Sequence, residues 1–375
     1  MRVRLDRAQF PELLSTLHDK GYRVIGPQVR DGAIVYDTLT KTEELPIGWT
    51  DRQEAGTYQL ERRDDEALFG YVVGPQSWRK EFIPPKQKLW TATKGENGFT
   101  LTEPPLPTQK IALLGVRSCE LKAIEIQDRV FRSDQFVDPV YHSQRKNSFL
   151  IAVNCVEAGN TCFCVSMDSG PKAKSGYDLS LTEVLQPIHH FVMEAGSDAG
   201  QEVLDSLTLS EATSEECQRA DDAVEHAAQN MGRTLDTTNI KDLLYDNAEH
   251  SNWSKIADRC MSCANCTLVC PTCFCTTVED TTDLTGENAE RWRRWDSCFN
   301  RDFSYVCGGP VRHSTSSRYR QWMTHKLAAW HDQFGTSGCV GCGRCVTWCP
   351  VGIDITQEVE VFRSEPSTST EKKEA

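Results

Sequence analysis

The spacing of hydrophobic residues predicts that the first third of the chain mixes helices with short strands. Residues 7–18 are expected to form an amphipathic helix that Asp6 caps and Gly21 ends. Its apolar positions, at the helical i, i+3, i+4, i+7 spacing, are Phe10, Leu13, Leu14 and Leu17. Strand-like runs bounded by Gly, Pro and Asp follow at Tyr22–Ile25, Ala33–Tyr36, Thr57–Leu60 and Leu68–Val73.

Two continuous apolar runs, Lys110–Val116 and Phe149–Val153, predict buried strands, and a helical pattern at Leu121–Phe131 lies between them. The order strand, turn, helix, strand is typical of an open α/β sheet. Cys119 and Cys155 follow the carboxyl ends of these strands, where α/β proteins place their ligand sites.

Four cysteines are therefore expected to converge in the N-terminal half: Cys119, Cys155, Cys162 and Cys164. We predict that they hold a third iron–sulfur cluster. Two alternatives remain open at this point. The four can be small buried hydrophobic residues, as free cysteines often are, or they can ligate zinc.

Further helices are expected in the rest of the N-terminal region and in the region that follows it. Helical patterns occupy Leu179–Ala195, Ser214–Met231, Asn239–Asp258 and Ser316–Asp332. We expect an α+β protein with an N-terminal α/β domain at 1–235, which docks partners, and a helical ferredoxin domain at 236–363. Residues 364–375 are rich in Ser, Thr, Glu and Lys, and are expected to form a disordered tail.

Composition restricts the classes of function that the chain can have. Of its 375 residues 17 are cysteines, and the formal net charge is −13, which argues against nucleic acid as a main partner. The first residues, MRVRLDRAQFPELL, contain no apolar core of a signal peptide, and no apolar run is long enough to cross a membrane. A cytoplasmic location is expected, where thiols serve metal or redox chemistry rather than disulfides.

Two cysteine runs give the strongest chemical signal. Both read C-x2-C-x2-C-x3-C-P, the ligand pattern of bacterial-type [4Fe–4S] clusters, in which the fourth cysteine of each run ligates the other cluster. The ligands expected for these two clusters are Cys260, Cys263, Cys266 and Cys270, and Cys339, Cys342, Cys345 and Cys349. Zinc sites usually need two C-x2-C pairs split by a longer gap, so zinc or disulfides fit these compact runs less well.

The remaining cysteines and the absence of known motifs restrict which residues and which activity can be assigned to the chain. Each run is complete, so we interpret Cys273, Cys275, Cys298 and Cys307 as non-ligands, and Cys217 as inert. The sequence contains no dinucleotide-binding G-x-G-x-x-G after a strand, no phosphate-binding loop and no H-E-x-x-H. The chain is thus expected to carry electrons without a catalytic site of its own.

From about residue 110 onward, the chain resembles the beta, iron–sulfur subunit of soluble sulfhydrogenase-type [NiFe] hydrogenases, and equally the corresponding iron–sulfur subunit of the anaerobic sulfite reductase. The segments that carry the resemblance are GVRSCELKAI (115–124), VNC (153–155), TCFC (161–164), WDSCF (295–299), RYRQWMTHKL (318–327) and both cysteine runs.

The resemblance implies an electron-transfer subunit between a flavin-containing, NAD(P)H-reactive partner and a catalytic partner. We expect that catalytic partner to be a hydrogenase, with sulfite reductase as the alternative. A hypothesis of another class is a zinc-structured scaffold without redox function.

Overall fold

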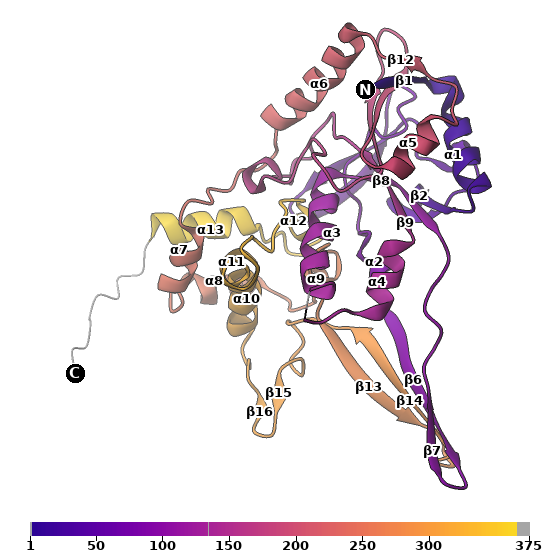
Figure 1. Ribbon diagram of the computed structural model, residues 1–375. Helices are drawn as coiled ribbons and strands as arrows, with labels where there is room; N and C mark the ends of the chain where they lie inside the picture. The colour runs from indigo at the N-terminus through magenta and orange to yellow at the C-terminus, as the bar shows by residue number, and fades with distance from the viewer. Residues whose placement is uncertain (1, 134, 366–375) are drawn as a thin grey trace.

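The computed structural model describes residues 2–133 and 135–365. Its largest element is an eight-stranded mixed sheet, in which β2, β8, β9 and β10 run parallel and the outer strands pair antiparallel (Figure 1). In spatial order the strands are β12 (Ser210–Glu211), β1 (Val3–Asp6), β11 (His190–Ala195), β10 (Leu179–Val184), β9 (Ser148–Val153), β8 (Ile111–Val116), β2 (Arg23–Arg30) and β3 (Ala33–Thr38).

The central strands are buried on both faces, as their continuous apolar runs predict. In β8, Ala112 and Leu114 face the core that contains α1 (Phe10–Asp19) and α5 (Asp198–Leu204). Leu113 and Val116 face the opposite core. The helices packed against that second core are α2 (Arg79–Phe82), α3 (Ser118–Phe131) and α4 (Pro139–Lys146). Helix α6 (Ser214–Gln229) lies against β10 and β11.

A separate four-stranded sheet forms an arm that projects away from the body (Figure 1). Its strands are β13 (Thr276–Thr282), β14 (Asn288–Trp295), β6 (Lys86–Gly95) and β7 (Gly98–Thr102), in this spatial order. Strand β14 pairs antiparallel with β6, so the arm combines strands from distant parts of the chain. Two smaller hairpins are β4 (Trp49–Glu54) with β5 (Thr57–Arg62), and β15 (Tyr305–Val306) with β16 (Gly309–Pro310).

The remainder of the C-terminal half is helical and has a core of its own. Its helices are α7 (Ile240–Asp246), α8 (Asn252–Arg259), α9 (Asn265–Leu268), α10 (Thr315–Thr324), α11 (Trp330–Phe334), α12 (Arg344–Thr347) and α13 (Ile355–Ser364). A π-helical segment, His325–Ala329, joins α10 to α11, so the predicted helix over Ser316–Asp332 forms one continuous helical stretch.

Three expectations from the sequence pattern are wrong. The helix expected at Leu179–Ala195 is instead β10 and β11, because the alternation of apolar and polar residues has a strand period and the cis Gln186–Pro187 bond lies in the turn between them. The helix expected at Asn239–Asp258 is divided into α7 and α8. Asp6 makes no capping bond, since its carboxylate accepts from Arg4.

The strand expected at Leu68–Val73 is also wrong, and its backbone partners explain why. The segment is buried but irregular. The Glu183 carboxylate accepts from the backbone N–H groups of Leu68 and Phe69, at 2.7 and 2.9 Å. The Arg117 guanidinium donates to the carbonyl oxygens of Phe69 and Tyr71, at 2.9 and 2.6 Å. Side chains thus satisfy backbone groups that a sheet would otherwise pair.

The boundary near residue 235 and the two domains of the sequence analysis remain predictions. Strands β6 and β14 come from opposite sides of that boundary, and yet they share one sheet. Most of the expected tail lies outside the described residues, and Ser364 is still the last residue of α13.

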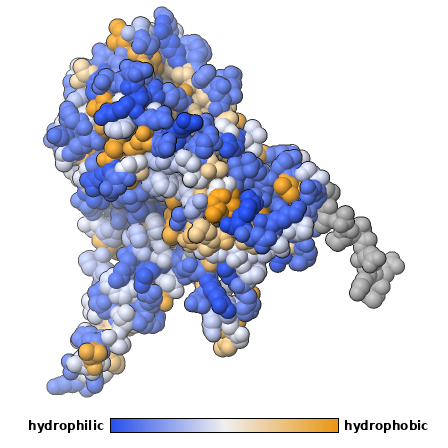
Figure 2. Space-filling model, turned by 180° about the vertical axis from the view of Figure 1, so that it is seen from behind, coloured by the Kyte–Doolittle hydropathy of each residue, from blue (hydrophilic) through white to orange (hydrophobic). Residues whose placement is uncertain are grey.

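The surface is largely hydrophilic on the face drawn in Figure 2, where hydrophobic residues gather only in small groups. No helix in the described part of the chain is both long and apolar enough to cross a bilayer.

Candidate iron–sulfur sites

The first site is a pocket of about 440 Å³ that contains sulfur atoms from both cysteine runs. The cysteines that line it are Cys260, Cys263, Cys266, Cys345 and Cys349. Three come from the first run, and Cys349 is the fourth cysteine of the second run. This arrangement agrees with the crossed ligation that the spacing predicts. We define the first site as Cys260, Cys263, Cys266 and Cys349.

Local backbone geometry directs these thiols into the pocket. Helix α8 ends at Arg259, and the chain then passes through left-handed conformations at Ser262 and Ala264. This curl lets the backbone N–H of Ser262 donate to the sulfur of Cys260 at 3.4 Å. On the other side, the N–H of Ile353 donates to the sulfur of Cys349 at 3.3 Å. Such N–H···S contacts favour a thiolate over a thiol.

The inner walls of the first site are apolar. Phe299, Tyr319 and Trp322 line the pocket and pack together, with ring centroids 5.3–6.0 Å apart. Burial raises the pKa of Cys266 well above its ordinary value, and the neighbouring thiols of Cys260 and Cys349 add to this increase. Neutral thiols facing one apolar cavity become good ligands once iron replaces their protons.

The second site consists of Cys339, Cys342 and Cys345 with Cys270, the fourth cysteine of the first run. Burial raises the pKa of Cys339 to about 12, and it also raises the pKa values of Cys342 and Cys345. The Cys270 thiol lies close enough to contribute to each of these three increases. We define the second site as these four cysteines, which are again crossed between the two runs.

One cation lies among the second-site ligands. The Lys326 ammonium donates to the sulfur of Cys270 at 3.1 Å and to the hydroxyl of Thr272 at 3.0 Å. A hydrogen bond from Cys273, together with Lys326, holds the pKa of Cys270 well below its ordinary value. The ammonium contact thus favours the thiolate form of Cys270 over the thiol.

The third site gathers the four cysteines that the sequence analysis selected in the N-terminal half. Cys119 lies in the first turn of α3, after the carboxyl end of β8, and Cys155 follows β9. All four line one pocket, together with Cys342 of the second run and other residues. The structure thus brings the four cysteines together, as the sequence analysis expects.

The third site adjoins the second site through a close approach of backbones. A Cβ atom added at Gly341 would lie 2.5 Å from the carbonyl oxygen of Phe163, and one at Gly343 would lie 2.4 Å from that of Thr161. Both glycines have positive φ, so this contact between the TCFC loop and the second run requires glycine twice. Cys342, between these glycines, lines the third pocket and belongs to the second site.

Comparison with known proteins agrees with this geometry. A 4Fe-4S dicluster domain family matches residues 259–353, which include both cysteine runs. Residues 259–353 form a 4Fe-4S dicluster domain. Over nearly its whole length the chain is similar to sulfhydrogenase 2 subunit beta of Pyrococcus furiosus, with 29% identity over 364 residues, 96% of this chain and 98% of that protein. The resemblance to the beta subunit of sulfhydrogenases, inferred from the sequence, is confirmed.

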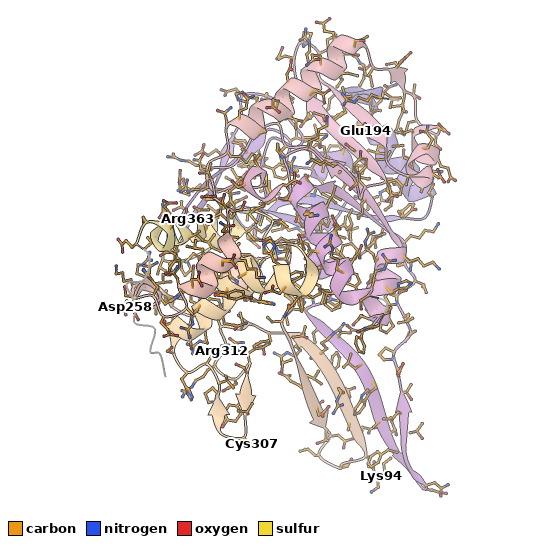
Figure 3. The ribbon with its side chains drawn as sticks, turned by 60° about the vertical axis from the view of Figure 1, so that its left-hand side comes forward. Lys94, Glu194, Asp258, Cys307, Arg312 and Arg363 are labelled. Carbon is orange, nitrogen blue, oxygen red and sulfur yellow. The ribbon has the colours of Figure 1, made fainter. Side chains whose placement is uncertain are left out.

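Four further cysteines lie in the dicluster domain outside the first and second sites. Cys275, just before β13, hydrogen-bonds with Cys298, beyond β14, at the base of the arm. Cys273 contacts Lys326 at 3.5 Å and Cys270. Cys307 is exposed at the end of the short hairpin, away from the body (Figure 3). That these four are non-ligands remains a prediction.

The thiols of the first and third sites line pockets, an arrangement that suits a cluster. Within the described residues, no three His, Cys, Asp or Glu side chains converge closely enough to hold one metal ion. The functional residue that sequence reasoning missed is Lys326, which reads as an ordinary position on an amphipathic helix because its sulfur partner is 56 residues away.

Proposed function

We propose that the chain is the electron-transfer iron–sulfur subunit of a hydrogenase-type complex. It relays electrons between a flavin-containing, NAD(P)H-reactive partner and a catalytic partner, which we propose to be a [NiFe] hydrogenase. The observation that carries this proposal is the contiguity of three cysteine-lined sites. Cys342 of the second site lines the third pocket, and Cys345 of the second site lines the first pocket.

The protein contributes binding, orientation and exclusion of water. The dicluster domain supports [4Fe–4S] clusters, and we propose one cluster in each of the three sites. When bound, such clusters accept and release single electrons. The first site has the most accessible ligand, because Cys263 is exposed and Met261 beside it is 67% exposed. It is therefore suited to exchange electrons with a partner, whereas the second site lies inside the protein.

A rigid connection between the second and third sites supports electron transfer between them. The Arg344 guanidinium, between two second-site cysteines, lies 2.7 Å from the Glu120 carboxylate next to Cys119. Thr161 and Thr347 hydrogen-bond at 2.8 Å across the same contact. Fixed ligands keep the distances between redox groups short and constant, which is the requirement for a relay.

Anaerobic purification of the full chain tests the proposal. The protein should be brown, should bleach with dithionite and should contain about 12 iron atoms, four for each of three clusters. A colourless protein loaded with zinc would contradict the proposal and favour the scaffold hypothesis. A content of about 8 iron atoms would contradict only the third cluster and leave the other two.

The partners need a separate experiment. The purified chain alone should not oxidise NADH or NADPH, and it should be reduced by NADPH only when a flavin-containing partner is added. Affinity purification of the tagged chain from its own cells, followed by mass spectrometry, identifies the catalytic partner. A co-purified protein with a nickel site supports the proposal, whereas a sirohaem protein in its place supports the sulfite reductase alternative.

A further inference from the structure

We propose that Lys326 sets the reduction potential of the second site and makes this site easier to reduce than the first. The proposal rests on the ligand assignment of the proposed function. It assigns a role to a residue outside both cysteine runs.

Lys326 is held in place for contact with sulfur. Its side chain leaves the π-helical segment His325–Ala329 and is 5% exposed. Its ammonium donates to Cys270 Sγ at 3.1 Å, and it contacts Cys273 Sγ at 3.5 Å and the Gly338 carbonyl oxygen at 3.4 Å. A π-helical turn inside an α-helix is rare and frequently marks a functional position.

The ammonium has no carboxylate to balance its charge. Among the described residues, Lys326 forms no ion pair with Asp or Glu, although the described ion pairs include even the fully buried Arg344–Glu120 pair. A buried charge without a counter-charge is strongly unfavourable. The groups within reach of Lys326 that can carry negative charge are the sulfur atoms of Cys270 and Cys273, so Cys270, a ligand of the second site, supplies compensating charge.

A second buried cation, Arg79, contacts the backbone between Cys266 and Cys273. Arg79 is 4% exposed, stacks on the ring of Trp295 at 3.6 Å and donates to the carbonyl oxygens of Leu268 and Thr267, at 2.8 and 3.2 Å. It also donates to the carbonyl oxygen of Cys273. Like Lys326, it has no carboxylate partner in the described part of the chain.

The first site lacks an equivalent cation. In the described structure its thiols accept hydrogen bonds from the backbone N–H groups of Ser262 and Ile353. The nearby Arg318 donates to the Ser262 hydroxyl and to the carbonyl oxygen of His313, and it contacts no sulfur. The two sites therefore share the ligand pattern and differ in a direct ammonium–sulfur contact.

This difference has a defined electrostatic consequence. Reduction adds one negative charge to a cluster, and an adjacent positive charge stabilises the reduced form more than the oxidised form. Hydrogen bonds to the sulfurs and the local net charge are among the factors that set cluster potentials. Lys326 thus favours the electron on the second site over the first.

The test compares Lys326→Met, Lys326→Arg and Lys94→Met in the full chain, by redox titration followed with electron paramagnetic resonance. Lys94 lies at the far end of the arm (Figure 3), so its replacement removes the same charge at a distance. A Cys270→Ser variant assigns the second-site signal. In Lys326→Met the reduction equilibrium constant of the second site should fall at least about tenfold, which is about 59 mV for one electron. Lys326→Arg should retain most of the potential.

The outcomes distinguish the inference about Lys326 from the proposed function of the whole chain. Unchanged second-site potential in Lys326→Met with full iron content overturns the inference and leaves the proposed function intact. Absence of [4Fe–4S] signals in the unmodified protein contradicts the proposed function itself. If Lys326→Met takes up no iron, the order of reduction in the unmodified protein decides, because the inference requires the second site to be reduced before the first.

Discussion

The Arg344 guanidinium and the Glu120 carboxylate form an ion pair at 2.7 Å with both side chains fully buried. Arg344 belongs to the second cysteine run, whereas Glu120 follows Cys119 at the start of α3. The pair also receives a hydrogen bond from the Tyr36 hydroxyl at 3.0 Å. One buried ion pair thus joins the second site to the sheet that carries the third site.

Removal of Glu120 should therefore destabilise the whole protein. In Glu120→Ala the Arg344 charge stays buried without its carboxylate, and the free energy of unfolding should fall by about 3–5 kcal/mol. Chemical denaturation of the iron-loaded protein without air measures the change. The control is Asp280→Asn, which breaks an exposed pair with Arg291 on the arm and should have no measurable effect. If Glu120→Ala and the unmodified protein are equally stable, the ion pair does not contribute to the free energy of unfolding.

The crossed arrangement predicts which cluster each ligand variant damages. Cys349→Ser should disturb the cluster of Cys260, Cys263 and Cys266, because Cys349 lines that pocket. Electron paramagnetic resonance of the reduced protein should show loss or broadening of that signal alone. Cys217→Ser, which changes a cysteine outside the three sites, is the control. Damage confined to the cluster of the second run would refute the crossing.

The third site can be tested by iron content. Cys162→Ser should lower the iron bound from about 12 to about 8 atoms per chain, since one of three [4Fe–4S] clusters is lost. The tetrapeptide TCFC also occurs at residues 272–275, and the control Cys275→Ser changes a cysteine of that second copy, outside the sites. Full iron content in Cys162→Ser would assign a packing role to this group.

The contact between the second and third sites should not tolerate a side chain. In Gly341→Ala the new Cβ would lie 2.5 Å from the Phe163 carbonyl oxygen, so the TCFC loop has to move. We expect a lower melting temperature and weaker iron binding at the third site. Gly286→Ala is a suitable control, because Gly286 also has positive φ but no atom within 4 Å of an added Cβ. A melting temperature equal to that of the control would contradict the close approach.

Cys275 should react with electrophiles at lower pH than an ordinary cysteine. A hydrogen bond from Cys298 lowers the pKa of Cys275 to about 7. Below this pH the thiol is protonated and unreactive, and above it the thiolate forms, so alkylation by iodoacetamide should rise with a midpoint near the lowered pKa rather than at about 8.5. Peptide mass spectrometry measures the rate, with exposed Cys307 as a reference for reagent access. Cys298→Ala should move the midpoint upward.

The candidate ligands could be predicted from the sequence, whereas the residues that surround them could not. Ligand spacing is local, so the two runs and their crossing follow from the pattern of cysteines alone. The third group could be predicted because Cys119 and Cys155 follow apolar runs that read as parallel strands, and parallel strands bring their carboxyl ends to one edge. Lys326 and Glu120 depend on distant partners, and no local pattern distinguishes them from surface charges.

Two parts of the fold were not predicted correctly, for different reasons. Strands β13 and β14 are polar and half exposed, because they form an arm rather than a core. The segment at Leu68–Val73 has an apolar pattern typical of a strand, but Glu183 and Arg117 satisfy its backbone instead. In both cases tertiary contacts outweigh local preference.

The arm also affects how the protein folds during synthesis on the ribosome, because its strands come from distant parts of the chain. Lys88 and Glu290, which face each other across β6 and β14, are 202 residues apart in the chain. At about 5–20 residues per second, β6 waits roughly 10–40 s for its partner strand. During that time its edge can pair with another nascent chain, and Lys86 and Lys88 are the kind of charged side chains that discourage such pairing. Loading with iron at the second site comes later still, because its ligands are complete only after residue 345 has been made.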